Sequence, residues 1–391
     1  MSKDVIIKVE NLCKLYGKNK AEATELMKRG ADKDTVYKKT GVTVALWDVS
    51  FEVERGKIFV IIGLSGSGKS TLIRCLNLLT KPTSGKIYFE GEDIQKFSKQ
   101  QILNYRRNKI SMVFQNFGLM SHRNVLNNVA YGLEVKNVPR QLRENKAREM
   151  IALVGLDGWE EQAISNLSGG MKQRVGLARA LASDPDVLLM DEPFSALDPL
   201  VRREMQFELL SIQSKLEKTI IFITHDINEA FKLGDTVAIM RDGKIIQIDT
   251  PERMSARPAD DYVREFIESA DKTQILTAKH VMIRPKCLVK PKDMPSQAIR
   301  EMGANDVSTA YVVDDKMKFL GVITIDDAIL ARDKNLPMPS LIKTDVYTCH
   351  EDTILSEILS IAAESKYPLA VLDSQGKLKG IISKAAVLSS L

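Results

Sequence analysis

The strongest chemical signal in the sequence is a glycine-rich segment, residues 63–71, which fits the spacing Gly-x4-Gly-Lys-Ser. Glycines let backbone N–H groups close around phosphate oxygens, and a helix that starts directly after them adds its positive end. Lys69 can reach the β and γ phosphates of a nucleoside triphosphate, and the Ser70 hydroxyl can ligate Mg²⁺. The predicted phosphate-binding residues are Gly63, Ser65, Gly66, Ser67, Gly68, Lys69, Ser70 and Thr71.

Two adjacent carboxylates, Asp191 and Glu192, follow a second apolar run at 187–190. Carboxylates at the C-terminal end of a buried strand point into the ligand crevice of an open sheet. Successive side chains diverge there, so the two can serve different roles. We expect Asp191 to hold Mg²⁺, directly or through water, and Glu192 to polarise the attacking water. With the phosphate segment, this pair predicts hydrolysis of a nucleoside triphosphate.

The elements that must position these groups are strands alternating with helices. The apolar run 58–62 is typical of a buried strand leading into the phosphate segment, and 71–79 is typical of the helix that leaves it. Strand and helix signals alternate to about residue 250, which favours an α/β fold with a mainly parallel core sheet. Residues 20–40 form a charged, helix-like insert.

A third motif, Leu-Ser-Gly-Gly-Met-Lys-Gln-Arg at 167–174, adds a family resemblance. With the two sites above, it resembles the signature of ABC ATPases, over roughly residues 5–265. The resemblance implies a P-loop ABC ATPase domain with a helical subdomain, ATP and Mg²⁺ as ligands, and a head-to-tail homodimer. Each signature closes the other subunit's site in such a dimer, so Ser168, Gly169 and Gly170 would bind a γ-phosphate there.

The same resemblance implies roles for four further residues. Gln115 and His225 resemble the Q-loop glutamine and the switch histidine, so they join Glu192 as predicted catalytic residues, and Gln115 is also a predicted Mg²⁺ ligand. Asp198 resembles the D-loop aspartate, which contacts nucleotide. Tyr16 stands where the family places a ring that stacks on adenine, and a plain packing role for it stays open.

Beyond an expected linker at 270–276, the sequence repeats with a period of 59 residues. Asp314 corresponds to Asp373, and Gly321 to Gly380. Each copy reads as an extended segment, a helix, two short strands and a helix, and the pair resembles tandem CBS modules. The predicted domains are an ABC ATPase at 1–270 and an α+β CBS pair at 277–334 and 335–391.

In CBS modules, a Gly-x-x-Ser/Thr-x-x-Asp run places a hydroxyl at phosphate and a carboxylate at ribose. Thr324 and Asp327 fit this run in the first copy. Ser383 fits in the second copy, but Ala386 replaces the expected Asp, which puts ribose recognition there in doubt. The resemblance implies a regulatory site for an adenine dinucleotide such as cyclic di-AMP, while a purely structural pair stays open.

Three features narrow the family resemblance further. They are the insert at 17–44, the exact amino-acid sequence of the phosphate segment, and the run 194–200. All three resemble the corresponding parts of ATPases of glycine betaine/proline betaine (osmoprotectant, OpuA-type) importers. This implies an integral-membrane permease that carries, or is joined to, a substrate-binding protein. Carnitine, choline or an amino acid as cargo, and a non-transport role, stay open.

Composition sets the remaining bounds. The chain has 391 residues, 27% of them charged, and a formal net charge of +5, which excludes a disordered chain and predicts no nucleic-acid partner. The four cysteines are far apart, which predicts reduced thiols. No run approaches 18 apolar residues, so we expect a protein at the cytoplasmic face of the plasma membrane, attached through partners.

The positive charge is concentrated locally. Residues 272–292 contain six Lys or Arg and no acidic residue. Such a stretch could bind anionic lipid headgroups, neutralise the phosphates of a dinucleotide, or form an ordinary solvated face.

Overall fold

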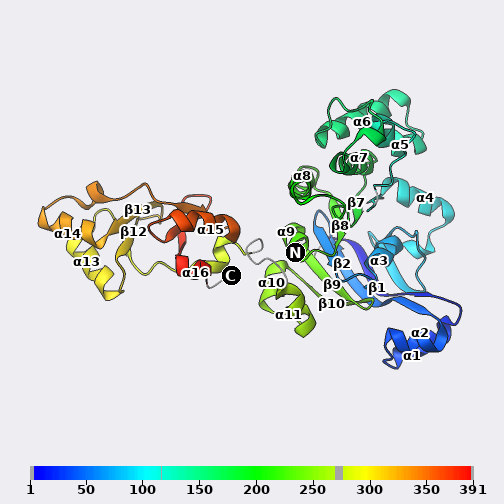
Figure 1. The fold of residues 1–391 in the computed structure, drawn as a ribbon, viewed down its shortest axis with the longest axis horizontal. Coiled ribbons are helices and arrows are strands. Elements are labelled where there is room, and N and C mark those ends of the chain that lie inside the picture. The colour runs from blue at the N-terminus through cyan, green and yellow to red at the C-terminus, as the bar shows by residue number, and fades with distance from the viewer. Residues whose placement is uncertain (1–3, 116, 269–275, 389–391) are drawn as a thin grey trace. The chain divides into compact units, whose positions relative to one another are not determined.

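The computed structural model describes residues 4–115, 117–268 and 276–388. The chain divides into two compact units, Met1–Ser269 and Ala270–Leu391, which are described separately (Figure 1). The expected linker at 270–276 lies, except for its last residue, outside the described residues. Within these ranges, no helix combines the length and the apolar character needed to cross a bilayer.

The core of the first unit is a six-stranded sheet in the order β10-β9-β3-β8-β7-β6. Neighbouring strands are parallel except at the edge, where β10 runs antiparallel to β9, and this confirms the predicted α/β fold. Every residue of β3, β7 and β8 is buried, as expected for strands covered on both faces. The strands are β3 (Ile58–Ile62), β6 (Ile110–Val113), β7 (Val187–Asp191), β8 (Thr219–Thr224), β9 (Thr236–Arg241) and β10 (Lys244–Asp249).

A second, antiparallel sheet of this unit has the order β2-β1-β4-β5. The strand predicted at 5–10 is longer than expected, because β1 pairs with β2 as far as Tyr16. Helix α3 (Lys69–Leu76) buries Leu72 and Ile73 in a core shared with both sheets, which fixes the start of the helix beside the end of β3. The strands are β1 (Val5–Tyr16), β2 (Thr43–Glu54), β4 (Ser84–Phe89) and β5 (Glu92–Asp93).

Three helices, α5, α6 and α7, pack against one another and form the helical subdomain that the family resemblance predicts (Figure 1). Among the other helices of the unit, α4, α9 and α10 contact β6, β3 and β10, respectively. The helices are α4 (Lys99–Asn108), α5 (Val125–Val135), α6 (Arg140–Leu153), α7 (Gly169–Ala182), α8 (Pro199–Leu216), α9 (Ile227–Leu233), α10 (Pro251–Ala256) and α11 (Asp261–Glu268), with short 3₁₀ turns at Ile94–Lys96 and Ile164–Asn166.

The charged insert folds as a hairpin of two short helices, α1 (Lys20–Lys28) and α2 (Lys33–Thr40). Its apolar residues form a small core with the ends of β1 and β2, in which Val36 is fully buried. The Asp32 side chain caps α2 by accepting a hydrogen bond from the backbone N–H of Thr35, and Gly41 ends it with φ +68°. The hairpin is therefore packed against the ends of β1 and β2 through its apolar residues, and α2 is capped at both of its ends.

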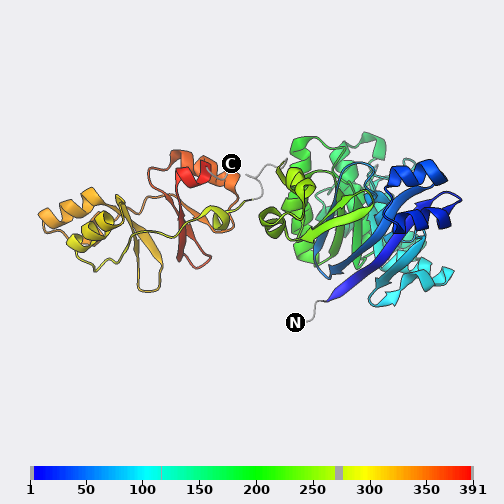
Figure 2. The same ribbon diagram turned by 90° about the horizontal axis from the view of Figure 1, so that it is seen from below.

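The second unit contains two three-stranded sheets, β11-β12-β13 and β14-β15-β16, with the same pairing directions (Figure 2). This is the repeat predicted from the 59-residue period. The elements are α12 (Ala278–Val281), β11 (Leu288–Val289), α13 (Pro295–Ala304), β12 (Thr309–Val313), β13 (Phe319–Thr324), α14 (Ile325–Asp333), a 3₁₀ turn (Met338–Leu341), β14 (Thr348–His350), α15 (Leu355–Glu364), β15 (Leu369–Leu372), β16 (Leu378–Ile382) and α16 (Lys384–Leu388).

Equivalent positions of the two copies pair with each other where the copies meet. Lys318 forms an antiparallel bridge with Lys377, its counterpart one period later. The Phe319 N–H donates to the carbonyl of Gly376, and an equivalent bond runs from Leu378 to Met317. The two copies are thus related by an approximate two-fold relation that the hydrogen bonds follow.

The copies also exchange their leading segments. Ile283, which precedes β11 in the first copy, pairs with Ile381 in β16 of the second. Lys343, which precedes β14 in the second copy, pairs with Val322 in β13 of the first. Each copy therefore completes the other, so neither is a complete packing unit by itself.

Candidate functional site

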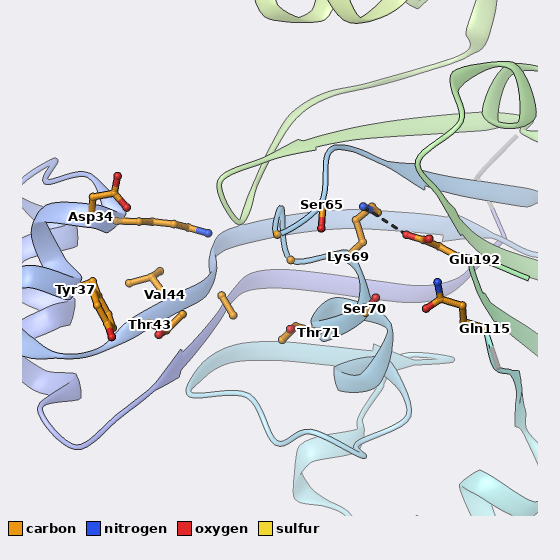
Figure 3. Close-up of a pocket in the computed structure, with 14 residues that line it drawn as sticks. Asp34, Tyr37, Thr43, Val44, Ser65, Lys69, Ser70, Thr71, Gln115 and Glu192 are labelled. Carbon is orange, nitrogen blue, oxygen red and sulfur yellow. Dashed lines mark ion pairs between the residues drawn. The ribbon is translucent and has the colours of Figure 1, made fainter. Parts of the chain in front are cut away.

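One cavity of about 650 Å³ opens at the carboxyl ends of β3 and β7 (Figure 3). It brings together three stretches that are far apart in the sequence: the phosphate segment, Gln115 and Glu192. It also includes residues of the inserted hairpin. The lining residues are Lys33, Asp34, Tyr37, Thr43, Val44, Ala45, Ser65, Gly66, Gly68, Lys69, Ser70, Thr71, Gln115 and Glu192.

The phosphate segment takes a conformation that requires its glycines. Gly66 and Gly68 have φ of +81° and +104°, and a side chain on Gly68 would lie 2.5 Å from the carbonyl oxygen of Ala45. Ser67 is buried, and its carbonyl accepts a hydrogen bond from the Gly243 N–H in the turn between β9 and β10. Gly63 also has no room for a side chain, because the carbonyl of Met240 lies against it.

Lys69 is buried inside this loop and is 5% exposed. Its Nζ donates to the carbonyl oxygens of Gly63 and Leu64, at 2.7 and 3.1 Å, and lies 3.9 Å from Glu192 Oε1. Burial lowers the pKa of Lys69, while the nearby charges of Glu192 and Asp191 act in the opposite direction. A lysine held mainly by neutral carbonyls is available to phosphate oxygens.

Asp191 and Ser70 meet at the start of α3. The Ser70 hydroxyl donates to Asp191 Oδ1 at 2.9 Å, and Asp191 is 4% exposed. Burial raises the pKa of Asp191, against the opposing effects of the Ser70 hydrogen bond and of Arg74. A hydroxyl and a carboxylate side by side are the hard oxygen donors that suit Mg²⁺, which usually takes few protein ligands and keeps water and phosphate oxygens.

Within the described ranges, no group of three or more His, Cys, Asp or Glu side chains could hold a metal by itself. A site made of Ser70, Asp191 and phosphate oxygens does not need one. The donor set therefore fits the predicted Mg²⁺ ion.

Glu192 stands at a strained position directly after β7. Its φ is +46°, and its N–H donates to the carbonyl of Ile223. Its Oε2 lies 3.1 Å from His225 Nδ1, which approaches from the end of β8. Gln115 lines the cavity and donates from Nε2 to Ser195 Oγ at 3.4 Å. The three predicted catalytic side chains thus lie at one end of the cavity, although His225 itself is not among its lining residues.

The signature residues do not line this cavity. Ser168 caps α7 by accepting a hydrogen bond from the Met171 N–H at 3.3 Å, and both Ser168 and Gly169 are exposed. Gly170 is buried, and a side chain there would lie 2.5 Å from Val201 Cγ1. Asp198 likewise lies outside the cavity and caps α8. Their predicted roles belong to a dimer and stay predictions in a single subunit.

Tyr16 is also absent from the cavity lining. It is 44% exposed at the end of β1, and Lys14 Nζ lies 4.6 Å from the centroid of its ring. Lys33 and Tyr37 of the hairpin reach the cavity instead, and no motif in the sequence pointed to either. The predicted stacking role of Tyr16 stays a prediction.

In the second unit, the predicted ligand residues bind each other. Thr324 caps α14 and shares a capping box with Asp327. Lys343 Nζ lies 2.8 Å from Asp327 Oδ2 and 3.4 Å from the Tyr367 hydroxyl. Burial by itself would raise the pKa of Asp327, but hydrogen bonds from Lys343 and Thr324 outweigh it and lower that pKa.

Ser383 has a comparable capping role in the second copy. Its hydroxyl accepts a hydrogen bond from the Ala386 N–H at 3.1 Å. A small cavity of about 120 Å³ lies nearby, with Ser365, Tyr367 and Lys384 in its lining, but Ser383 is not part of that lining. The structure thus places Thr324 and Asp327 together and Ser383 in the other copy.

The basic stretch at 272–292 is partly neutralised by acidic residues from elsewhere. Lys290 and Lys292 both pair with Asp315, and Lys279 pairs with Asp352. The part of the stretch before residue 276 lies outside the described residues.

The comparisons with known proteins agree with these two units. A family model described as ABC transporter matches residues 46–195, and the CBS domain model matches 278–334 and 340–391. The chain is 47% identical over 389 residues to the glycine betaine transport ATP-binding protein OpuAA of Bacillus subtilis (strain 168), covering 100% of this chain and 93% of that protein. It is 47% identical over 386 residues to the glycine betaine/carnitine transport ATP-binding protein GbuA of Listeria monocytogenes serotype 1/2a (strain 10403S), covering 98% and 97%.

A solved structure gives a similar result for the first unit. The dimeric, post-hydrolysis ATP-binding cassette MJ0796 bound to ADP and Pi is 29% identical, with a TM-score of 0.54. The match covers 63% of this chain and 99% of that one.

Proposed function

Because the chain belongs to the ABC transporter ATPases and carries a tandem CBS pair, we propose that it is the ATP-hydrolysing subunit of a quaternary-amine importer. Its cargo would be an osmoprotectant such as glycine betaine or proline betaine. Support for the cargo comes from the relatives, which are named for glycine betaine transport and align over nearly the whole chain. Support for hydrolysis comes from the chain's own cavity.

The main support for the proposal that the chain hydrolyses ATP is that three groups line one cavity. Lys69 and Ser70 come from the phosphate segment, and Glu192 comes from the end of β7. These are the parts that phosphoryl transfer to water needs: charge neutralisation, a metal-binding hydroxyl and a group that positions water.

Each side chain has a distinct part in the reaction. Lys69 would exchange its bonds to backbone carbonyls for bonds to the β and γ phosphates. Glu192 would hold the attacking water in line with the γ-phosphorus, while His225 at 3.1 Å orients its carboxylate. Ser70 and Asp191 would hold Mg²⁺, which, when bound, neutralises charge on the phosphate oxygens.

Replacement of Glu192 tests this assignment. Glu192→Gln keeps the shape of the side chain but weakens its ability to polarise water, so we expect ATP turnover to fall about 10²–10⁴-fold with ATP binding retained. Glu204→Gln, at an exposed position on α8, is the matched control and should hydrolyse ATP normally. Near-normal turnover by Glu192→Gln would refute the proposed role.

ATPase subunits of this family act with membrane permeases and form dimers. We propose that this chain pairs with a second copy, so that the signature of each copy closes the other's cavity. The pair would dock on a permease that carries or is joined to a substrate-binding protein, at the cytoplasmic face of the plasma membrane. Co-purification with an integral-membrane subunit tests this, and a soluble partner alone would favour the non-transport alternative.

Cargo is decided outside this chain, because the ATPase does not touch the transported molecule. Uptake of labelled glycine betaine, proline betaine, carnitine, choline and an amino acid by the reconstituted importer separates these candidates. If the importer took up only the amino acid in an ATP-dependent way, the quaternary-amine assignment would be overturned.

We propose that the second unit regulates hydrolysis. Its candidate ligands are an adenine dinucleotide such as cyclic di-AMP, at Thr324, Asp327 and Ser383, and anionic lipid headgroups, at the basic stretch. The ion pairs of Lys279, Lys290 and Lys292 are exposed and therefore weak, so a phosphate could displace them. Titration of the full chain with cyclic di-AMP, and separately with anionic vesicles, tests the two ligands.

A further inference from the structure

We propose that the inserted hairpin forms the outer wall of the nucleotide cavity. In this arrangement Lys33 supplies an additional cation for the phosphate chain, and Tyr37 supplies a surface on which the base packs. The inference rests on the proposed function, because it takes the ligand of the cavity to be a nucleoside triphosphate.

The position of the two side chains supports this role. Lys33 and Tyr37 are four residues apart on α2, so they lie on the same face of the helix, and both line the cavity with Lys69. Figure 3 shows Tyr37 and Glu192 at opposite ends of the cavity, with Lys69 near Glu192. Because Lys69 and Glu192 mark the γ-phosphate end, the base would extend toward Tyr37.

The hairpin holds these side chains in place. Val36 lies between them in the sequence and is fully buried against the ends of β1 and β2. The Asp32 side chain fixes the start of α2 through the Thr35 N–H at 2.7 Å. A docked helix presents its side chains in a defined geometry, which reduces the entropic cost of ligand binding.

Lys33 has a charge that the protein leaves without a close partner. It is half-buried, and none of the described side chains forms an ion pair or hydrogen bond with it. Burial lowers the pKa of Lys33, and the charge of Lys244 adds to this, while Asp242 acts in the opposite direction. Asp34 lines the same rim but is exposed and does not pair with it.

Lys33 also lies close to the phosphate segment. A side chain at Gly243 would lie 2.8 Å from Lys33 Nζ, and the Gly243 N–H is bonded to the carbonyl of Ser67. An ammonium beside this loop gains a partner when a phosphate chain occupies the loop.

The Tyr37 ring is exposed, as expected for a ring that becomes covered only when a ligand binds. It is 58% exposed, and none of the described residues forms a ring contact or hydrogen bond with its side chain. Tyr16, by contrast, lies outside the cavity and has the Lys14 ammonium over its ring. Bases stack on aromatic rings irrespective of sequence, so Tyr37 offers affinity for the base.

The test measures binding by the full-length chain in calorimetric titrations with two ligands, ATP and inorganic tripolyphosphate, which has no base. Lys33→Met should weaken binding of both ligands about tenfold, the loss expected for one charge-assisted hydrogen bond. Tyr37→Ala should weaken only ATP binding, about five- to tenfold, and Tyr37→Phe should restore most of that loss. Lys38→Met is the charge-matched control, because Lys38 is exposed on α2 and outside the cavity.

The outcomes separate the parts of the proposal. Unchanged binding of both ligands by Lys33→Met, or an equal loss in Lys38→Met, would overturn the role of Lys33. If Tyr37→Ala bound ATP with unchanged affinity and Tyr16→Ala bound it more weakly, the base would stack on Tyr16 and the role of Tyr37 would be overturned. If the wild-type chain binds no ATP at all, the proposed function fails rather than this inference.

Discussion

Each unit has a lysine near a carboxylate, but the two lysines differ in their hydrogen-bond partners and in their distance from the carboxylate. In the first unit Lys69 Nζ lies 3.9 Å from Glu192 and binds backbone carbonyls instead. In the second, Lys343 Nζ lies 2.8 Å from Asp327. The first arrangement leaves the cation free to take a phosphate, whereas the second must break an ion pair before either group can bind a ligand. Ligand binding at Asp327 therefore carries the added cost of separating a close ion pair, whereas Lys69 has mainly to exchange neutral carbonyls for phosphate oxygens.

The largest effect should come from removing the two lysines in turn. Lys69→Met deletes a buried cation at the phosphate segment, so ATP hydrolysis should fall about 10²–10³-fold. Lys343→Met removes a lysine that is already paired within the second unit, and hydrolysis without regulatory ligand should stay within about twofold of wild type. Steady-state ATPase assays on the full chain measure both.

A comparable loss of hydrolysis in both variants would break the comparison. It would mean that the second unit supports the ATPase site even when no ligand is bound to it.

A smaller difference is expected between alanine substitutions at two glycines with positive φ, measured as the loss of free energy of unfolding. Gly68→Ala forces a side chain to φ +104° and to 2.5 Å from the carbonyl of Ala45, which should destabilise the first unit by about 2–3 kcal/mol. Gly376→Ala places a side chain at φ +75° in open space, which should cost the second unit about 1 kcal/mol.

Urea unfolding measures the two losses separately. Tryptophan fluorescence reports the first unit, because Trp47 and Trp159 both lie in it, and far-UV circular dichroism follows the second transition. Equal losses at the two sites would show that backbone conformation alone, and not the closed packing of the phosphate segment, sets the requirement for glycine.

Much of the nucleotide site could be predicted from the sequence, because its chemistry depends on local spacing. The phosphate segment contains its donors within nine consecutive residues, and Asp191 and Glu192 stand directly after an apolar strand. A parallel sheet brings the carboxyl ends of its strands to one edge, so the meeting of Ser70 and Asp191 follows from the fold class.

Other contacts could not be predicted, because they depend on how separate segments pack. Lys33 and Tyr37 reach the cavity only because the hairpin docks on β1 and β2. The sequence of a charged, amphipathic insert does not show on which strands the insert packs. The pairing of Lys343 with Val322 requires the copies to exchange leading segments. A sequence repeat looks the same whether each segment packs on its own copy or on the other.

The smallest effect concerns the pH dependence that the Asp327–Lys343 pair gives the second unit. Hydrogen bonds lower the pKa of Asp327 in the folded state, below the value of about 4 for an unfolded Asp. Folding therefore gains stability from this carboxylate above the unfolded pKa, and the gain is lost as the pH falls through the lower, folded pKa. The whole contribution should be about 1 kcal/mol or less, because Lys343 is 41% exposed.

Asp327→Asn should remove this part of the acid sensitivity. At pH 7 the variant should unfold slightly more easily than wild type, and the difference should vanish at low pH, where the wild-type carboxyl is protonated. Asp326→Asn, an exposed neighbour on the same helix, is the control and should leave the pH profile unchanged. A wild-type pH profile in Asp327→Asn would contradict this prediction, because it would mean that the Asp327–Lys343 pair contributes no acid sensitivity to the second unit.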